Sequence, residues 1–121
     1  MTRDRSNGQA LAEAAQRYIE AHSTERFSLE KMSRALYING SYLMRVFRQM
    51  TGTTPLCYHH KVRCDRAKAL LTKTDQTISQ VGETVGFVTS SHFTHVFRDT
   101  VGCTPTEYRR QHRQADEGEQ A

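Results

Sequence analysis

Two sets of polar side chains, 50 positions apart, repeat the same order and spacing in this 121-residue chain. The first set is Ser41, Arg45 and Arg48, and the second is Ser91, His95 and Arg98. Hydroxyl, guanidinium and imidazole groups can donate hydrogen bonds, and the guanidinium group also carries a fixed positive charge. No glycine-rich phosphate loop or strained turn presenting a nucleophile accompanies them. The predicted chemistry is therefore binding to an acceptor-rich or anionic partner, and not catalysis by an enzyme.

These residues belong to a longer internal repeat. Residues 41–63 align without a gap with residues 91–113, and nine of the 23 positions are identical. Unrelated stretches would share about one or two positions, and solenoids need at least about three copies to bury a continuous core. Two copies therefore indicate a functional module that is present twice. The identical pairs are Ser41/Ser91, Val46/Val96, Phe47/Phe97, Arg48/Arg98, Gly52/Gly102, Thr54/Thr104, Pro55/Pro105, Tyr58/Tyr108 and Arg63/Arg113.

Helices have to position the repeated side chains, because apolar residues recur at helical spacing through most of the chain. The predicted fold class is all-α, with seven helices and no convincing strand. Ser28, Asn39 and Thr89 are placed to cap helices, and Gly52 and Gly102 are placed to end them. The predicted helices cover residues 9–22, 29–36, 40–51, 55–71, 78–85, 90–101 and the segment from 105 onward.

Composition divides the chain into four segments. Residues 1–8 are polar without periodicity and are predicted as a flexible N-terminus, and residues 114–121 are predicted as a disordered acidic tail. Residues 9–71 and 72–113 each hold one copy of the repeated module, and the first of these segments includes a long linking helix. A chain of this length supports a modest core, and we expect no large ligand-binding or catalytic domain in it.

The charge balance favours an anionic partner. The chain has 17 Lys and Arg against 13 Asp and Glu, which gives a formal net charge of +4 and a pI of about 9.2. No apolar run approaches the roughly 20 residues that a membrane span needs, and the N-terminus has no signal-peptide pattern. We expect a cytoplasmic, nucleoid-associated protein without a membrane partner.

Cys57, His60 and Cys64 occupy positions i, i+3 and i+7 of the fourth predicted helix, a spacing that a zinc or redox site could use. No fourth ligand has a matching spacing, and Cys64 falls on the predicted inward face, where a free cysteine behaves as a small hydrophobic residue. The odd number of cysteines argues against a disulfide framework. We therefore expect no metal and no cofactor, and we expect His59 and His60 to lie at the surface or near DNA phosphates and not to be catalytic.

A short helix, a tight turn and a second capped helix form the helix-turn-helix pattern, which presents its second helix to the major groove of DNA. The inward side of this second helix is predicted to hold Leu43, Val46, Phe47 and Met50 in the first copy and Phe93, Val96, Phe97 and Thr100 in the second. The opposite side faces outward. The predicted DNA-binding residues are Ser41, Tyr42, Arg45, Arg48, Gln49, Ser90, Ser91, Thr94, His95 and Arg98.

The outward side chains suit different parts of a duplex. Arg45 can make a bidentate contact to guanine, whereas Arg48 and Arg98 are best placed to hold phosphates. The linking helix over residues 56–71 is roughly 24 Å long. This length favours a spacer that seats the two outward helices in successive major grooves, which lie about 34 Å apart, so that a monomer would read two half-sites.

Four motifs in the second copy form a distinctive combination: Gly86-Phe87, the run Ser91 to Arg98, Gly102, and the segment Thr104 to Arg109. This combination resembles the C-terminal signature of AraC/XylS-type bacterial transcription regulators, and the resemblance covers residues 11–112. It implies seven helices in two helix-turn-helix subdomains joined by a long linking helix. It also implies binding to double-stranded promoter DNA and, as a rule, recruitment of RNA polymerase.

The chain looks like the stand-alone type of this family, similar to the multiple-antibiotic-resistance and superoxide-response activators, which implies a monomeric transcription activator. Two alternatives stay open: a detached DNA-binding output domain of a longer ligand-responsive regulator, and a protein-interaction module without DNA readout. Tyr37 departs from the family, which generally has Gly at this turn position, as at Gly86. Because a positive φ is unfavourable for Tyr, we expect the first turn to differ in shape.

Overall fold

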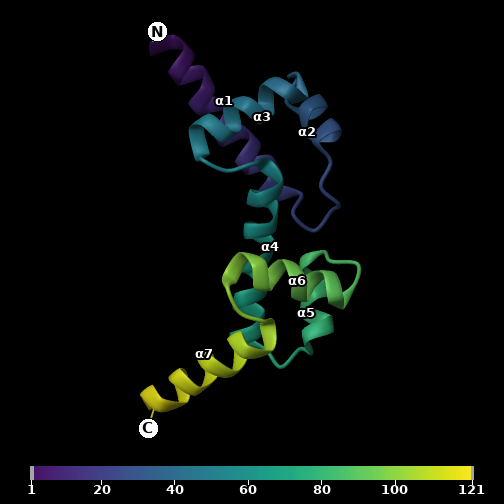
Figure 1. Ribbon diagram of the computed structural model, residues 1–121, viewed down its shortest axis with the longest axis vertical. Helices are drawn as coiled ribbons and strands as arrows, with labels where there is room; N and C mark the ends of the chain where they lie inside the picture. Colours follow the sequence, from purple (N-terminus) through teal and green to yellow (C-terminus); the bar gives the residue numbers. More distant parts are fainter. Residues whose placement is uncertain (1, 121) are drawn as a thin grey trace. The chain divides into compact units, whose positions relative to one another are not determined.

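Seven α-helices make up the computed structural model, which describes the backbone of residues 2–120 and the side chains of residues 7–113 (Figure 1). No strand occurs over residues 2–120, and the predicted all-α fold is confirmed. All the predicted helices are present. They are α1 (Thr2–Ala21), α2 (Leu29–Ala35), α3 (Gly40–Thr51), α4 (Pro55–Lys73), α5 (Ile78–Val85), α6 (Ser90–Val101) and α7 (Pro105–Gln120).

Side-chain caps and glycines fix the ends of α3 and α6, the second helix of each helix-turn-helix. The side-chain oxygen of Asn39 accepts hydrogen bonds of 2.9 and 3.2 Å from backbone N–H groups in the first turn of α3. The hydroxyl of Thr89 accepts a 3.1 Å bond from the first turn of α6. Gly52 and Gly102 end the two helices with φ of 77° and 100°, a left-handed conformation that glycine adopts without steric strain. The predicted boundaries of both helices are therefore confirmed.

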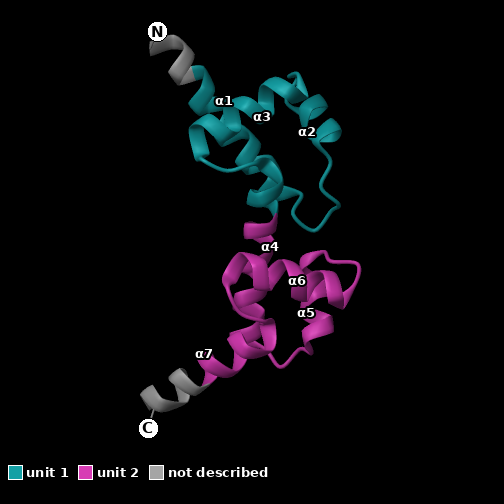
Figure 2. Ribbon diagram, viewed as in Figure 1, with its two compact units in different colours: residues 1–59 teal, residues 60–121 magenta. Residues whose placement is uncertain are grey.

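The chain folds as two compact units, residues 1–59 and residues 60–121, and helix α4 belongs to both (Figure 2). The sequence analysis placed the division after residue 71, at the end of the linking helix. The structure places it earlier because Cys64, Ala67 and Leu71 of α4 are fully buried in the core of the second unit.

Helix α1 packs closely on α3 in the first unit through Gly8. The sequence analysis assigned Gly8 to a flexible N-terminus, but Gly8 is helical and buried. A Cβ atom on Gly8 would lie 2.7 Å from Cε of Met50, so the glycine permits a close helix contact. Apart from Asn7 and Gly8, the predicted flexible N-terminus lies outside the residues whose side chains are described, as does the predicted acidic tail (residues 114–121).

Aromatic side chains from α6 form much of the core of the second unit. Phe93 and Phe97 are fully buried, with ring centroids 5.8 Å apart, and Val96 is buried beside them. Thr100, which was also predicted to face inward, is exposed, although its side chain hydrogen-bonds the thiol of the buried Cys64. Val101, the next residue, packs against the core instead.

The turns of the two helix-turn-helix modules have the same hydrogen-bonded shape. Tyr37 N–H donates to the carbonyl of Arg34, and the next residue donates five positions back, to Ser33. Gly86 and Phe87 repeat both bonds after α5, with Glu83 and Gly82 as acceptors. The expectation of a differently shaped first turn is therefore wrong: Tyr37 adopts φ 55° where Gly86 has φ 113°. The hydrogen bonds enforce the left-handed conformation even though it is strained for a tyrosine.

Replacing Tyr37 with Gly should raise the free energy of unfolding by about 0.5 to 1 kcal/mol, because the strain is relieved and little packing is lost. The tyrosine is 94% exposed. Chemical denaturation of the two proteins measures the difference. The matched control is Gly86→Ala, which introduces a Cβ at the equivalent position and should destabilise the chain. A loss of stability on Tyr37→Gly would contradict the strain argument.

Candidate nucleic-acid interface

The outward face of α3 has the composition that the sequence analysis predicted. Ser41, Tyr42, Arg45, Arg48 and Gln49 are all exposed, while the opposite face is buried. The cap fixes where α3 begins, and burial of Leu43, Val46 and Phe47 fixes its rotation with respect to the core. Five hydrogen-bonding side chains, two of them cationic, therefore share one accessible surface.

Helix α6 presents the matching face of the second unit. Ser90, Ser91, His95 and Arg98 are exposed, as predicted. Thr94 is only half-exposed, because its position lies beside the buried stripe of the helix. The repeat therefore holds in three dimensions within each unit, although Thr94 offers less surface than the other candidates.

The cationic side chain of Arg45 is held by an aromatic ring. The guanidinium carbon of Arg45 lies 5.3 Å from the centroid of the Tyr42 ring, within the range of a cation–π interaction. Tyr42 and Arg45 are three residues apart, a spacing at which side chains on a helix are neighbours.

The equivalent residues of α6 are held in another way. His95 Nε2 lies 3.2 Å from Oδ2 of Asp99, four residues later. His92, the counterpart of Tyr42, packs edge-on against Phe87, with ring centroids 5.3 Å apart, and lies 6.5 Å from the ring of His60. The pairing of His95 with Asp99 was not predicted from the sequence, although their i, i+4 spacing on a helix could have indicated it.

His60 is partly buried, which differs from the surface position predicted for it. Burial lowers the pKa of His60, and the nearby His92 and Arg63 lower it further because they disfavour a second positive charge. The neutral imidazole is therefore favoured at this position.

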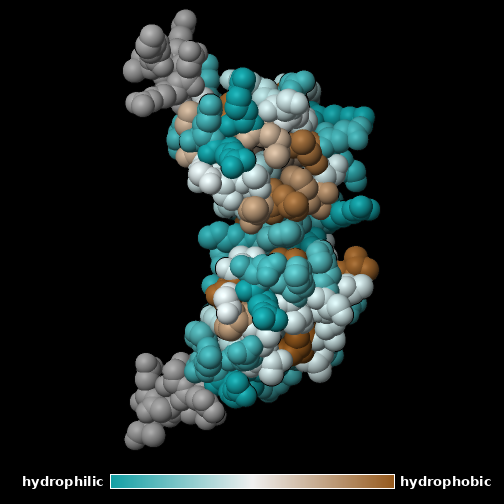
Figure 3. Space-filling view, viewed as in Figure 1, coloured by the Kyte–Doolittle hydropathy of each residue, from teal (hydrophilic) through white to brown (hydrophobic). Residues whose placement is uncertain are grey.

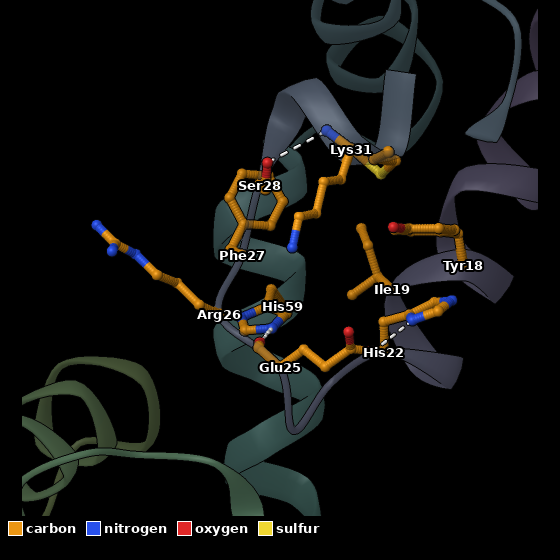
Figure 4. Close-up of a pocket in the computed structure, with 10 residues that line it drawn as sticks. Tyr18, Ile19, His22, Glu25, Arg26, Phe27, Ser28, Lys31 and His59 are labelled. Carbon is orange, nitrogen blue, oxygen red and sulfur yellow. Dashed lines mark hydrogen bonds and ion pairs between the residues drawn. The ribbon is translucent and has the colours of Figure 1, made fainter. Parts of the chain in front are cut away.

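His59 is buried in the first unit, and the prediction that it lies at the surface is wrong. Its Nε2 lies 3.2 Å from the carbonyl oxygen of Glu25, and its ring packs near Phe27, with centroids 5.6 Å apart (Figure 4). These contacts attach the loop between α1 and α2 to helix α4. The adjoining cavity has a volume of about 20 Å³, which is enough for a water molecule and too small for an organic ligand.

The three cysteines are free thiols, and two of them have very different environments. Cys57 is exposed, whereas Cys64 is buried, and burial raises the pKa of the Cys64 thiol. Among the residues that the structure describes, no three histidines, cysteines or acids are grouped so that they could hold a metal ion. No helix in the described part of the chain is long and apolar enough to cross a membrane.

Hydrophilic residues cover much of the face drawn in Figure 3, and the hydrophobic residues on it gather mainly over the first unit. The large hydrophobic residues with substantial exposure are Tyr37, Tyr42, Leu56 and Val88. Of these four, Tyr42 lies on an outward helix face described above. The surface of α3 and α6 is therefore suited to a polar, charged partner.

Comparison with known proteins agrees with this geometry. Two capped helices with polar outward faces, each following a short helix and a tight turn, define a helix-turn-helix DNA-binding domain. The family model described as a helix-turn-helix domain matches residues 32–111. The chain belongs to the AraC-type helix-turn-helix transcription regulators, a family of DNA-binding regulators and not a class of enzymes.

Relatives and solved structures support this membership. The chain is 37% identical over 108 residues to the HTH-type transcriptional regulator YijO of Escherichia coli (strain K12), covering 88% of this chain and 38% of YijO. An AraC-type regulator from Chromobacterium violaceum matches with a TM-score of 0.80 at 31% identity, covering 90% of this chain and 97% of that one. The DNA-binding domain of AdpA, solved in complex with a target DNA, matches with a TM-score of 0.76 at 28% identity, covering 87% and 94%. The chain spans little more than a third of the length of the first curated relatives.

Asp99 is an exposed acid on the outward face of α6, the face that is predicted to contact DNA. Replacing Asp99 with Asn should therefore tighten binding to any sequence by about twofold to fivefold at low salt, since a like-charge repulsion is removed. Fluorescence anisotropy with random duplex measures the change. The matched control is Gln49→Asp, which adds a carboxylate at the counterpart position of α3 and should weaken binding. Unchanged affinity in both variants would place these residues away from the DNA.

Proposed function

We propose that the chain binds promoter DNA in a sequence-specific manner through α3 and α6 and thereby regulates transcription. The observation that carries this proposal is the duplicated outward face. Three polar residues of α3 recur at the same spacing on α6, and all six are exposed on helices whose first turn is capped by a side chain. They are Ser41, Arg45 and Arg48 of α3 and Ser91, His95 and Arg98 of α6. The complex of the AdpA domain with its target DNA supports the assignment.

The side chains on these faces have separate roles in the proposal. Arg45 reads a guanine edge in the major groove, because its fork of donors matches the two acceptors of that base. Arg48 and Arg98 contact phosphates, which sets the register of each helix without reading sequence. Ser41, Tyr42, Gln49, Ser90, Ser91, Thr94 and His95 complete the proposed contact surface.

The two halves of the binding site differ in sequence under this proposal. The residues that build the scaffold are identical between the copies, whereas Arg45 is matched by His95 and Tyr42 by His92. The guanidinium group of Arg45 has more hydrogen-bond donors than an imidazole. The half-site read by α3 therefore supplies more of the specificity than the half-site read by α6.

The proposal also covers the oligomeric state of the chain on DNA, its protein partner and its effect on transcription. One chain binds as a monomer, its two reading helices occupy successive major grooves, and it activates transcription through contact with RNA polymerase in the cytoplasm. The stand-alone activators that the sequence resembles support these features. A second candidate is the DNA-binding output domain of a longer regulator, which the length of the curated relatives favours.

Sequence selection from a random duplex pool tests the function directly. The selected sites should have two parts, with roughly 10 base pairs between half-site centres, because one helical turn separates successive major grooves on one side of the duplex. Binding to random duplex should also fall by orders of magnitude between low and moderate salt, as phosphate contacts release counterions. A salt-independent interaction, or no enrichment of any sequence, would instead support a protein-interaction module.

The roles of two arginines on α3 can be separated by substitution. Arg45→Ala should weaken binding to the selected site by about 1 to 3 kcal/mol and relax preference at one base pair, because base contacts specify. Arg48→Ala should weaken binding to all sequences alike and reduce the salt dependence, because it removes a phosphate contact. Anisotropy titrations on selected and scrambled duplexes measure both effects. An equal loss on both duplexes for Arg45→Ala would contradict its role in base reading.

A further inference from the structure

The contact between Tyr42 and Arg45 gives the first reading helix a feature that the second helix lacks. The guanidinium carbon of Arg45 lies 5.3 Å from the centroid of the Tyr42 ring, and no acid pairs with Arg45 among the described residues. Unlike a carboxylate partner, an aromatic ring does not saturate the N–H donors of a guanidinium group with hydrogen-bond acceptors. Arg45 is therefore restrained while its N–H groups stay available.

The backbone of Tyr42 is fixed by the cap at the start of the helix. The backbone N–H of Tyr42 donates a 3.2 Å hydrogen bond to Oδ1 of Asn39, which caps α3. Tyr42 is exposed, at 41%, but Tyr has only two side-chain torsions, so that restraining it costs little entropy. The ring is therefore a suitable support for a long, flexible arginine side chain.

The second helix shows what happens at the same positions without this support. The ring of His92 packs against Phe87 and lies near His60. His95 pairs with Asp99, on its C-terminal side. Equivalent residues of the two reading helices therefore have different partners. Arg45 lies near the ring of Tyr42, toward the start of α3, whereas His95 pairs with the carboxylate of Asp99, toward the end of α6.

We propose that, within the contact surface, Tyr42 is a positioning residue: its ring holds the guanidinium group of Arg45 ready to contact a guanine, and its hydroxyl makes no hydrogen bond to the DNA. This inference rests on the proposed function, because it concerns how α3 recognises a base. Ordering an arginine side chain on binding opposes association, and a side chain that is already restrained loses less freedom. The aromatic ring of Tyr42, and not its hydroxyl, restrains the guanidinium group of Arg45.

A double-mutant cycle tests the proposal. The variants are Tyr42→Ala, Tyr42→Phe, Arg45→Ala and the double variant Tyr42→Ala/Arg45→Ala, each titrated against the selected duplex and against the same duplex with the Arg45-dependent guanine replaced. Tyr42→Ala should lose about twofold to fivefold in affinity and lose preference for that guanine, whereas Tyr42→Phe should keep both. The double variant should bind no more weakly than Arg45→Ala, because Tyr42 acts through Arg45.

The repeat supplies a matched control. His92→Ala and His95→Ala change the counterpart positions of α6, which make no contact with each other in the described structure, so their effects on affinity should add. The proposal is overturned if Tyr42→Phe loses as much affinity as Tyr42→Ala, which would make the hydroxyl a direct DNA contact. Additive losses for Tyr42 and Arg45 would also overturn it. Absence of salt-dependent DNA binding by the unaltered chain would overturn the proposed function itself, which is a distinct result.

Discussion

Burial of one phenylalanine in each unit determines which side of the reading helix stays exposed. Phe47 of α3 and Phe97 of α6 are fully buried, and their rings contact Tyr58 and Tyr108 of the following helices at centroid distances of 6.0 and 5.7 Å. Because a helix repeats about every 3.6 residues, fixing one side chain in the core fixes the direction of all the others. The polar faces are therefore a consequence of this aromatic contact, which is present twice.

Much of the fold could be predicted because the signals were local. Apolar spacing, polar caps and terminal glycines set the helices, and each of these depends on residues that are close in sequence. The close contact at Gly8 could not be predicted, since a glycine that ends a helix and a glycine that admits a neighbouring helix look alike in sequence. The exposure of Thr100 was missed for a related reason. The helical phase predicts the direction in which a side chain points, but it does not predict how far along the helix the core of the unit extends.

The candidate site also has features that could be predicted from the sequence and features that could not. The exposed residues of α3 and α6 follow from helical phase, so the sequence was sufficient to select them. The partners of Arg45 and His95 depend on the rotamer that each side chain adopts. The helical phase of a residue does not determine its rotamer. The burial of His59 likewise depends on a loop carbonyl, that of Glu25, which is 34 residues away in sequence.

Helix α4 belongs to both compact units, and this restricts how such a protein can diverge over evolutionary time. Between tandem modules, a flexible linker normally absorbs insertions and deletions. Here an added or lost residue within residues 64–71 would rotate Cys64, Ala67 or Leu71 by about 100° relative to the others and move it out of the core. Changes in length are therefore expected in the loops, while the two halves acquire separate preferences through single substitutions on their exposed faces.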